Sequence, residues 1–206
     1  IGKCAFPGIE LSIDDVQIIQ NACFDSQLLI RKQAMASLSE LFLAYPKSER
    51  LGMVWIQSVP TLAFDMEYSI QEQCASYWGR VILERLQSLM QNGDSPELDM
   101  LRVLLEEAGR PGTELPECSI KLCQTLVATG AIPPSLVFTL QDYVRTKPMK
   151  GGWFLLSCFT IPMPKNVVVE LVLTNWNRFK NDTTGALEEF KCKILAVVGS
   201  IVGLLD

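Results

Sequence analysis

The chain has 206 residues, of which 49% are hydrophobic, and a formal net charge of -5. This length suffices for one large domain or two small ones with a sizeable core, and the negative charge argues against a protein whose whole surface binds nucleic acid. The charge is uneven, because residues 1–140 carry ten Lys and Arg against seventeen Asp and Glu, whereas residues 141–193 carry eight against five. A partner with phosphate groups is therefore expected to prefer the C-terminal part.

The first ninety residues contain a repeat. "FDSQLLIRKQ" at 24–33 shares Phe, Asp, Ile and Gln, at the same four places, with "FDMEYSIQEQ" at 64–73. After each Asp, apolar positions follow at steps of 4, 4, 3, 1 and 3, which trace one face of an α-helix. They are Ile30, Ala34, Leu38, Leu41, Phe42 and Tyr45 in the first copy and Ile70, Cys74, Trp78, Val81, Ile82 and the stem of Arg85 in the second.

The segments before each Asp also have helical apolar spacing, so each copy is predicted to be two helices joined by a tight turn. A period near forty with this shape is typical of HEAT or armadillo repeats, whose neighbours stack to bury their apolar faces. The predicted fold class is therefore all-α, an α-solenoid of HEAT/armadillo-type helical hairpins.

The residues at the turns have predicted structural roles. The carboxylates of Asp25 and Asp65 are expected to cap the following helices by accepting backbone N–H bonds at the positive end of the helix dipole. Phe24 and Phe64 are expected to pack into the layer between the helices as plugs. Pro60 removes one backbone hydrogen bond and is expected to kink its helix.

Beyond residue 90 the repeat is less regular. We predict two HEAT-type repeats in residues 1–90, a turn-rich break with one helix in 91–117, and further helical hairpins of the same solenoid in 118–206. Helices are predicted at 97–108, 117–129, 134–145, 152–160, 165–180 and 184–205, and essentially no sheet. The longest apolar run, 194–205, is shorter than the ~20 residues that a membrane span needs, and because the chain stops inside it we expect a fragment of a longer protein.

The residue types argue against an enzyme. The absence of histidine removes Ser-His and Cys-His nucleophilic pairs and every His-based metal site. No Gly-rich phosphate loop is present, and Cys118 and Cys123 lack a second pair at zinc-ligand spacing. The seven cysteines are odd in number and irregularly spaced, which favours free thiols in a reducing compartment over a disulfide framework. We expect no catalysis, no cofactor and no metal.

Binding surfaces are therefore the expected functional sites. The candidate DNA- or partner-binding side chains are basic, because each contact to a phosphate adds salt-dependent affinity; they are Arg31, Lys32, Lys165, Arg178, Lys180, Lys191 and Lys193. The competing interpretation is that exposed helix faces carry Lys and Arg in any case. Trp153 and Trp176 are either anchors for a bound peptide or core residues, and the core interpretation is favoured.

Two stretches in the repeat region resemble a known family. Residues 25–46 and 54–74 are similar to a HEAT pair of the D-type non-SMC subunit of condensin II, and residues 152–162, Trp176 and 194–201 match further helices of that subunit in the same order. The matching positions of the first patch are Asp25, Ile30, Arg31, Lys32, Gln33, Ala34, Leu38, Glu40, Leu41, Trp55, Pro60, Asp65, Glu67, Gln71 and Glu72.

The resemblance implies a non-catalytic scaffold in the nucleus, on chromosomes. Such a subunit binds the kleisin and SMC subunits of condensin, works beside another HEAT subunit, and helps to hold double-stranded DNA during mitotic chromosome condensation. The ATP chemistry would belong to the SMC partners. The alternative from the residues alone is a HEAT or armadillo adaptor of another system, which binds an extended peptide and no nucleic acid.

Overall fold

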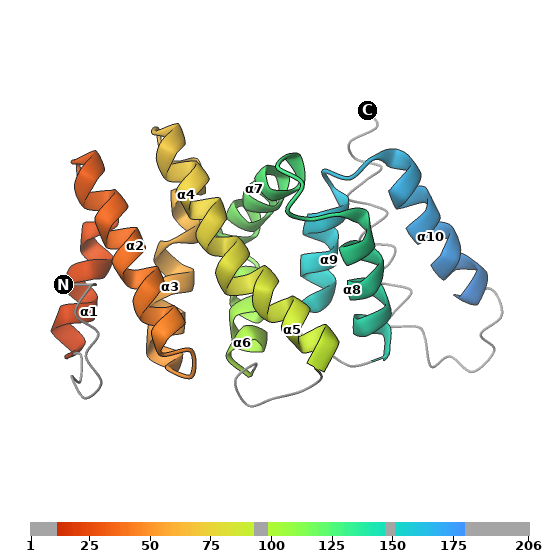
Figure 1. Cartoon of the computed structure of the whole chain (residues 1–206), viewed down its shortest axis with the longest axis horizontal. Coiled ribbons are helices and arrows are strands. Elements are labelled where there is room, and N and C mark those ends of the chain that lie inside the picture. The colour runs from red at the N-terminus through yellow and green to blue at the C-terminus, as the bar shows by residue number, and fades with distance from the viewer. Residues whose placement is uncertain (1–11, 93–98, 147–150, 180–206) are drawn as a thin grey trace.

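All regular structure in the residues described by the computed structural model, 12–92, 99–146 and 151–179, is helical, and no strand occurs there. The helices lie side by side in two rows along an elongated molecule (Figure 1). The predicted all-α solenoid is thereby confirmed. None of the described helices is both long enough and apolar enough to span a bilayer.

The first repeat consists of α1 (Ile13–Ala22) and α2 (Leu28–Ala44). A capping box starts α1: the Ser12 hydroxyl accepts a bond from the Asp15 N–H, and the Asp15 carboxylate accepts one from the Ser12 N–H, both at 3.1 Å. These bonds satisfy two N–H groups that the helix itself leaves unpaired. The apolar stripe of α2 then packs against α1.

The second repeat begins with α3 (Glu49–Ser58) and η1 (Pro60–Phe64), a 3₁₀ turn. The expected kink at Pro60 is therefore an outright end of the α-helix, because proline has no N–H to donate and its ring blocks the preceding turn. The return helix is α4 (Tyr68–Trp78), and it continues without a break through a π-helical segment, η2 (Gly79–Leu83), into α5 (Glu84–Asn92).

The two repeats stack in register. Helix α1 packs against α3 in one row and α2 packs against α4 in the other. Rods over 11–45 and 51–85 thus occupy adjacent, equivalent layers, as the repeat predicts.

The remaining helices extend the same two rows. They are α6 (Asp99–Ala108), α7 (Leu115–Ala128), α8 (Pro134–Thr146), α9 (Gly152–Thr160) and α10 (Lys165–Phe179). Helix α3 contacts α6, η1 contacts α7, and α9 packs between α7 and α8. These bounds agree with the predicted helices to within two residues. The helix predicted at 184–205 lies outside the described residues, and the division into 1–90, 91–117 and 118–206 stays a prediction.

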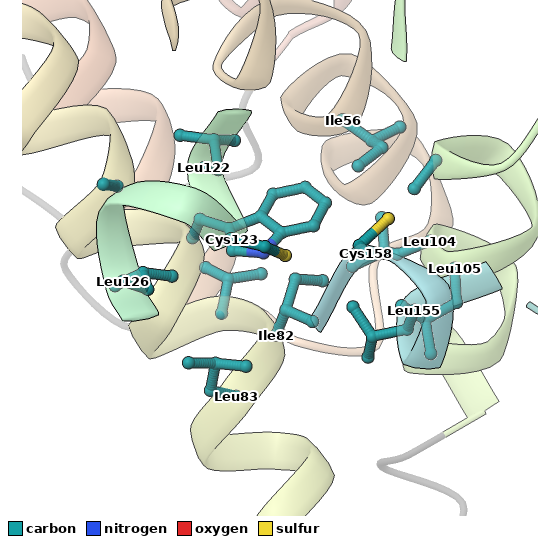
Figure 2. Packing of buried hydrophobic residues seen from close by; sticks show 14 of the residues in the cluster. Ile56, Ile82, Leu83, Leu104, Leu105, Leu122, Cys123, Leu126, Leu155 and Cys158 are labelled. Carbon is teal, nitrogen blue, oxygen red and sulfur yellow. The ribbon is translucent and has the colours of Figure 1, made fainter. Parts of the chain in front are cut away.

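An aromatic column joins the two repeats. The ring centroids of Phe42 and Trp55 are 6.0 Å apart, and those of Trp55 and Trp78 are 6.2 Å apart. The indole N–H of Trp55 donates to the Ser39 hydroxyl at 2.9 Å, so the buried polar group is satisfied. Further along, Ile82 lies between Cys123 of α7 and Leu155 of α9 (Figure 2), which links three layers into one core.

Two apolar pairs depart from the expectations. Phe24 and Phe64 are not plugs, since 56% and 58% of their surfaces are exposed. The preceding small residues Cys23 and Ala63 fill the inward positions instead, so each phenyl ring points out of the turn. Ile30 is 36% exposed although its counterpart Ile70 is fully buried, so the apolar stripes of the two copies are not buried equally.

Candidate partner-binding edge

An ion pair joins the turns of the two repeats. Arg31, one of the predicted binding residues, donates from Nε to Asp65 Oδ2 at 2.8 Å and from Nη2 to Asp65 Oδ1 at 3.1 Å. Its Nη1 donates to the carbonyls of Asp25 at 2.9 Å and Ser26 at 3.0 Å. The two charged side chains are only 14% and 8% exposed. The guanidinium thus uses four of its five N–H groups within the chain, which leaves little of it for a phosphate.

The aspartates act at the turns, but not as helix caps. The Asp25 carboxylate accepts the Gln27 N–H at 2.7 Å, and the Asp65 carboxylate accepts the Glu67 N–H at 2.9 Å. Helices α2 and α4 begin at Leu28 and Tyr68, one residue after these N–H groups, and their N-cap residues make no side-chain cap bond. The prediction that the aspartates cap these helices is therefore wrong. These are Asx turns, in which the side chain fixes the backbone two residues on.

The turns are held from inside the following helix as well. Gln71 Nε2 donates to the Asp65 carbonyl at 2.7 Å, as Arg31 does to the Asp25 carbonyl from the equivalent position of the first repeat. Each turn is therefore fixed by its own helix, and Arg31 additionally reaches the next turn. We refer to residues 24–29 and 64–68 together as the turn edge; it lies at the ends where α2 and α4 begin (Figure 1).

Large apolar side chains stand exposed along the turn edge. Their exposed fractions are 56% for Phe24, 77% for Leu29, 58% for Phe64, 96% for Met66 and 67% for Tyr68. The sequence interpretation missed this surface because it assigned the phenylalanines to the interior. The available signal was their recurrence beside a turn-forming Asp, where a short connection turns side chains outward.

The charges around the turn edge are mostly negative. Glu67 and Glu72 are exposed and Asp25 is partly exposed, whereas Arg31 is neutralised by Asp65. Lys32, the second predicted binding residue, is half-buried near the start of α2 and forms no ion pair with another described residue. Arg31 and Lys32 thus lie near this edge without forming a basic patch.

The other predicted binding residues are not brought to this edge. Lys165 and Arg178 belong to α10, but their side chains are not described. Lys180, Lys191 and Lys193 lie outside the described residues. Trp153 is partly buried against the core, in line with the favoured interpretation, and the side chain of Trp176 is not described.

The described cysteines behave as small apolar residues. Cys23, Cys74, Cys118, Cys123 and Cys158 are free and buried. Burial raises the pKa of the Cys23 thiol to about 12 and that of Cys118 to about 11, and the pKa values of Cys74 and Cys123 are also raised, chiefly by burial. Among the described residues, no three Cys, Asp or Glu side chains are grouped to hold a metal ion.

The chain is similar to two condensin subunits. It is 28% identical to the Condensin-2 complex subunit CAP-D3 of Arabidopsis thaliana, over 82% of this chain and 15% of that protein. It is 25% identical to the Condensin-2 complex subunit D3-L of Xenopus laevis, over 94% of this chain and 13% of that protein. No protein-family model and no solved structure matches the chain.

These similarities, together with the stacked hairpins, define a HEAT-type helical protein related to condensin II. The chain spans only about a seventh of the length of the relatives that it matches.

Proposed function

We propose that the chain is part of a non-catalytic HEAT scaffold subunit of a condensin-type SMC complex. It binds kleisin and SMC subunits beside another HEAT subunit, contacts chromatin DNA, and acts in the nucleus during mitotic chromosome condensation. The observation that carries the proposal is the similarity to two condensin-2 subunits across 82% and 94% of the chain.

The architecture supports a scaffold. A stack of helical hairpins offers long surfaces whose residues come from several repeats. The buried thiols have raised pKa values, so they are poor nucleophiles. In the proposed complex, ATP hydrolysis belongs to the SMC subunits.

The first experiment tests assembly. The full-length protein is co-expressed with the SMC and kleisin subunits of condensin II from the same organism and purified through a tag on the kleisin. We expect it to co-elute with them in gel filtration. A protein that remains separate from both kleisin and SMC subunits would contradict the proposal and would favour an adaptor of another system.

The second experiment tests DNA contact by the basic C-terminal part. We expect duplex DNA to bind the full-length protein with an affinity that falls steeply with salt, and the double substitution of Lys191 and Lys193 to Glu to lower the salt slope by about 2. The matched control is Lys121→Glu, in the acidic part of the chain (residues 1–140), which should leave the salt slope of DNA binding unchanged. An unchanged slope in the double variant removes these two lysines from the DNA site.

A further inference from the structure

The turn edge exposes apolar residues that the stack itself cannot cover. Phe64, Met66 and Tyr68 belong to the second repeat, which has the first repeat on one side and α7 on the other. Their exposure therefore does not arise from a missing neighbouring repeat at the end of the stack. Phe24 and Leu29 are exposed at the equivalent turn of the first repeat, which Arg31 joins to the Asp65 turn. Exposed aromatic, Met and Leu side chains at neighbouring turns are typical of protein-binding sites.

Contacts within the chain hold the turn edge in place. The Arg31–Asp65 pair fixes the two turns to each other, and the Asx turns and the Gln71 bond fix each turn internally. Side chains held on such a frame lose little conformational freedom on binding, which lowers the cost of association. Neighbouring helices in a stack lie about 8–10 Å apart, so the edge offers two apolar contacts at roughly that spacing.

Charge indicates which partner fits. Glu67 and Glu72 are exposed beside the apolar side chains, and Asp25 is partly exposed. Duplex DNA and an anionic membrane would be repelled by these carboxylates. A second copy, docked by the same edge through a two-fold axis, would bring two acidic rims together. A protein segment with Lys or Arg beside its apolar residues would be attracted.

We propose that the turn edge is the docking site for a basic amphipathic helix of a partner protein. Such a helix presents apolar residues at positions i and i+7 about 10 Å apart, which matches the two apolar contacts. The proposal goes beyond the proposed function because it does not depend on the partner's being a condensin subunit.

The test uses a display library of random linear peptides with the full-length protein as bait. We expect the selected peptides to combine aromatic or aliphatic residues at helical spacing with Lys or Arg. The double variant Phe64→Ser/Met66→Ser should weaken their binding about tenfold or more, as loss of interface anchors does. The substitution Glu67→Lys and added salt should weaken it as well. The control is Leu173→Ser, at an apolar site on α10 that is 54% exposed, which should leave binding unchanged.

Several outcomes would overturn the proposal. They are a selection without any peptide that depends on Phe64 and Met66, an enrichment of acidic peptides, and competition by duplex DNA or anionic vesicles for the same edge. Dimerisation of the wild-type protein that the double variant abolishes in sedimentation would instead assign the edge to a second copy. Thermal unfolding of all variants checks that binding losses are not losses of fold.

Discussion

Arg31 and Asp65 are 34 positions apart in the chain and form a two-pronged ion pair across the boundary between two repeats. A second inter-repeat pair joins Glu40 of α2 to Arg80 of η2 at 2.6 Å and is exposed to solvent. The two ion pairs join the same two repeats, but one is buried and the other is exposed. They therefore allow a matched comparison of how much an ion pair stabilises the packing of one repeat on the next.

Breaking the buried pair should destabilise the protein strongly. Asp65→Asn preserves the shape of the turn but leaves the Arg31 charge without its counter-ion in a mostly buried place. We expect the free energy of unfolding to fall by about 3 kcal/mol, measured by urea denaturation. The double variant Arg31→Met/Asp65→Asn should recover part of the loss, because no unpaired charge remains.

The exposed pair is the control. Glu40→Gln removes the partner of Arg80, and both side chains are more than 40% exposed. Its cost should be less than about 1 kcal/mol. If the two carboxyl substitutions cost the same, the buried pair does not hold the repeats together.

Gly151 should be irreplaceable. Its φ is +72°, and a Cβ there would come within 2.5 Å of the Leu105 backbone, so α9 can approach α6 only at a glycine. Gly151→Ala should cost about 3 kcal/mol in urea denaturation, the sum of left-handed strain and overpacking.

Gly112 separates these two causes. It has a similar φ of +80° but open space around its Cβ position. Gly112→Ala should therefore cost only the strain, about 1 kcal/mol. Equal losses at both glycines would show that the contact with Leu105 is unimportant.

The buried thiol of Cys23 should make stability fall at alkaline pH. Burial raises its pKa from 9.0 to about 12, so above pH 9 the unfolded chain loses this proton while the folded chain keeps it. The stabilisation is complete below pH 9 and is lost as the pH rises toward 12. Between these values the unfolding free energy of the wild type, relative to that of Cys23→Ala, should fall by about 1.4 kcal/mol per pH unit.

Val16→Ala provides the reference for that titration. It also removes buried volume from α1, but it removes no titrating group. The difference between the wild type and this variant should be independent of pH from 8 upward. A flat difference for Cys23→Ala as well would mean that the thiol ionises in the folded protein at its ordinary pKa.

The hydroxyl of Ser39 should matter through Trp55. Ser39→Ala leaves the buried indole N–H without an acceptor, which should lower the unfolding free energy by about 2 kcal/mol. In a Trp55→Phe background the same substitution should be nearly neutral, since no donor remains. A similar loss in both backgrounds would mean that Ser39 stabilises by packing alone.

The sequence predicts the helices of the repeats well because burial has the period of the helix. Ala34, Leu38 and Phe42 of the first copy and Cys74 and Trp78 of the second are buried, as their spacing indicates. Tight turns and the 3₁₀ segment at Pro60 change the ends by a residue or two, since a pattern of apolar residues marks a face and not a boundary.

The turn edge could not be predicted in the same way. Hydrophobicity favours a buried Phe64, but the short turn sends Ala63 inward and the phenyl ring outward. The Arg31–Asp65 ion pair could not be predicted from the pattern of one repeat either, because it joins two neighbouring repeats. Both features depend on how one helical hairpin packs against the next. The spacing of apolar residues along the sequence carries no information about that packing.

The long return helix of the second repeat has one further consequence. A π-helical segment such as Gly79–Leu83 accommodates one surplus residue, which turns everything after it by about 100° around the axis. The first half of this long helix, α4, therefore packs against η1 and α7, and its second half, α5, packs against α8. Deleting a single residue in this segment would rotate the apolar face of α5 away from α8. The packing of the later helices therefore depends on an irregularity that is one amino acid in size.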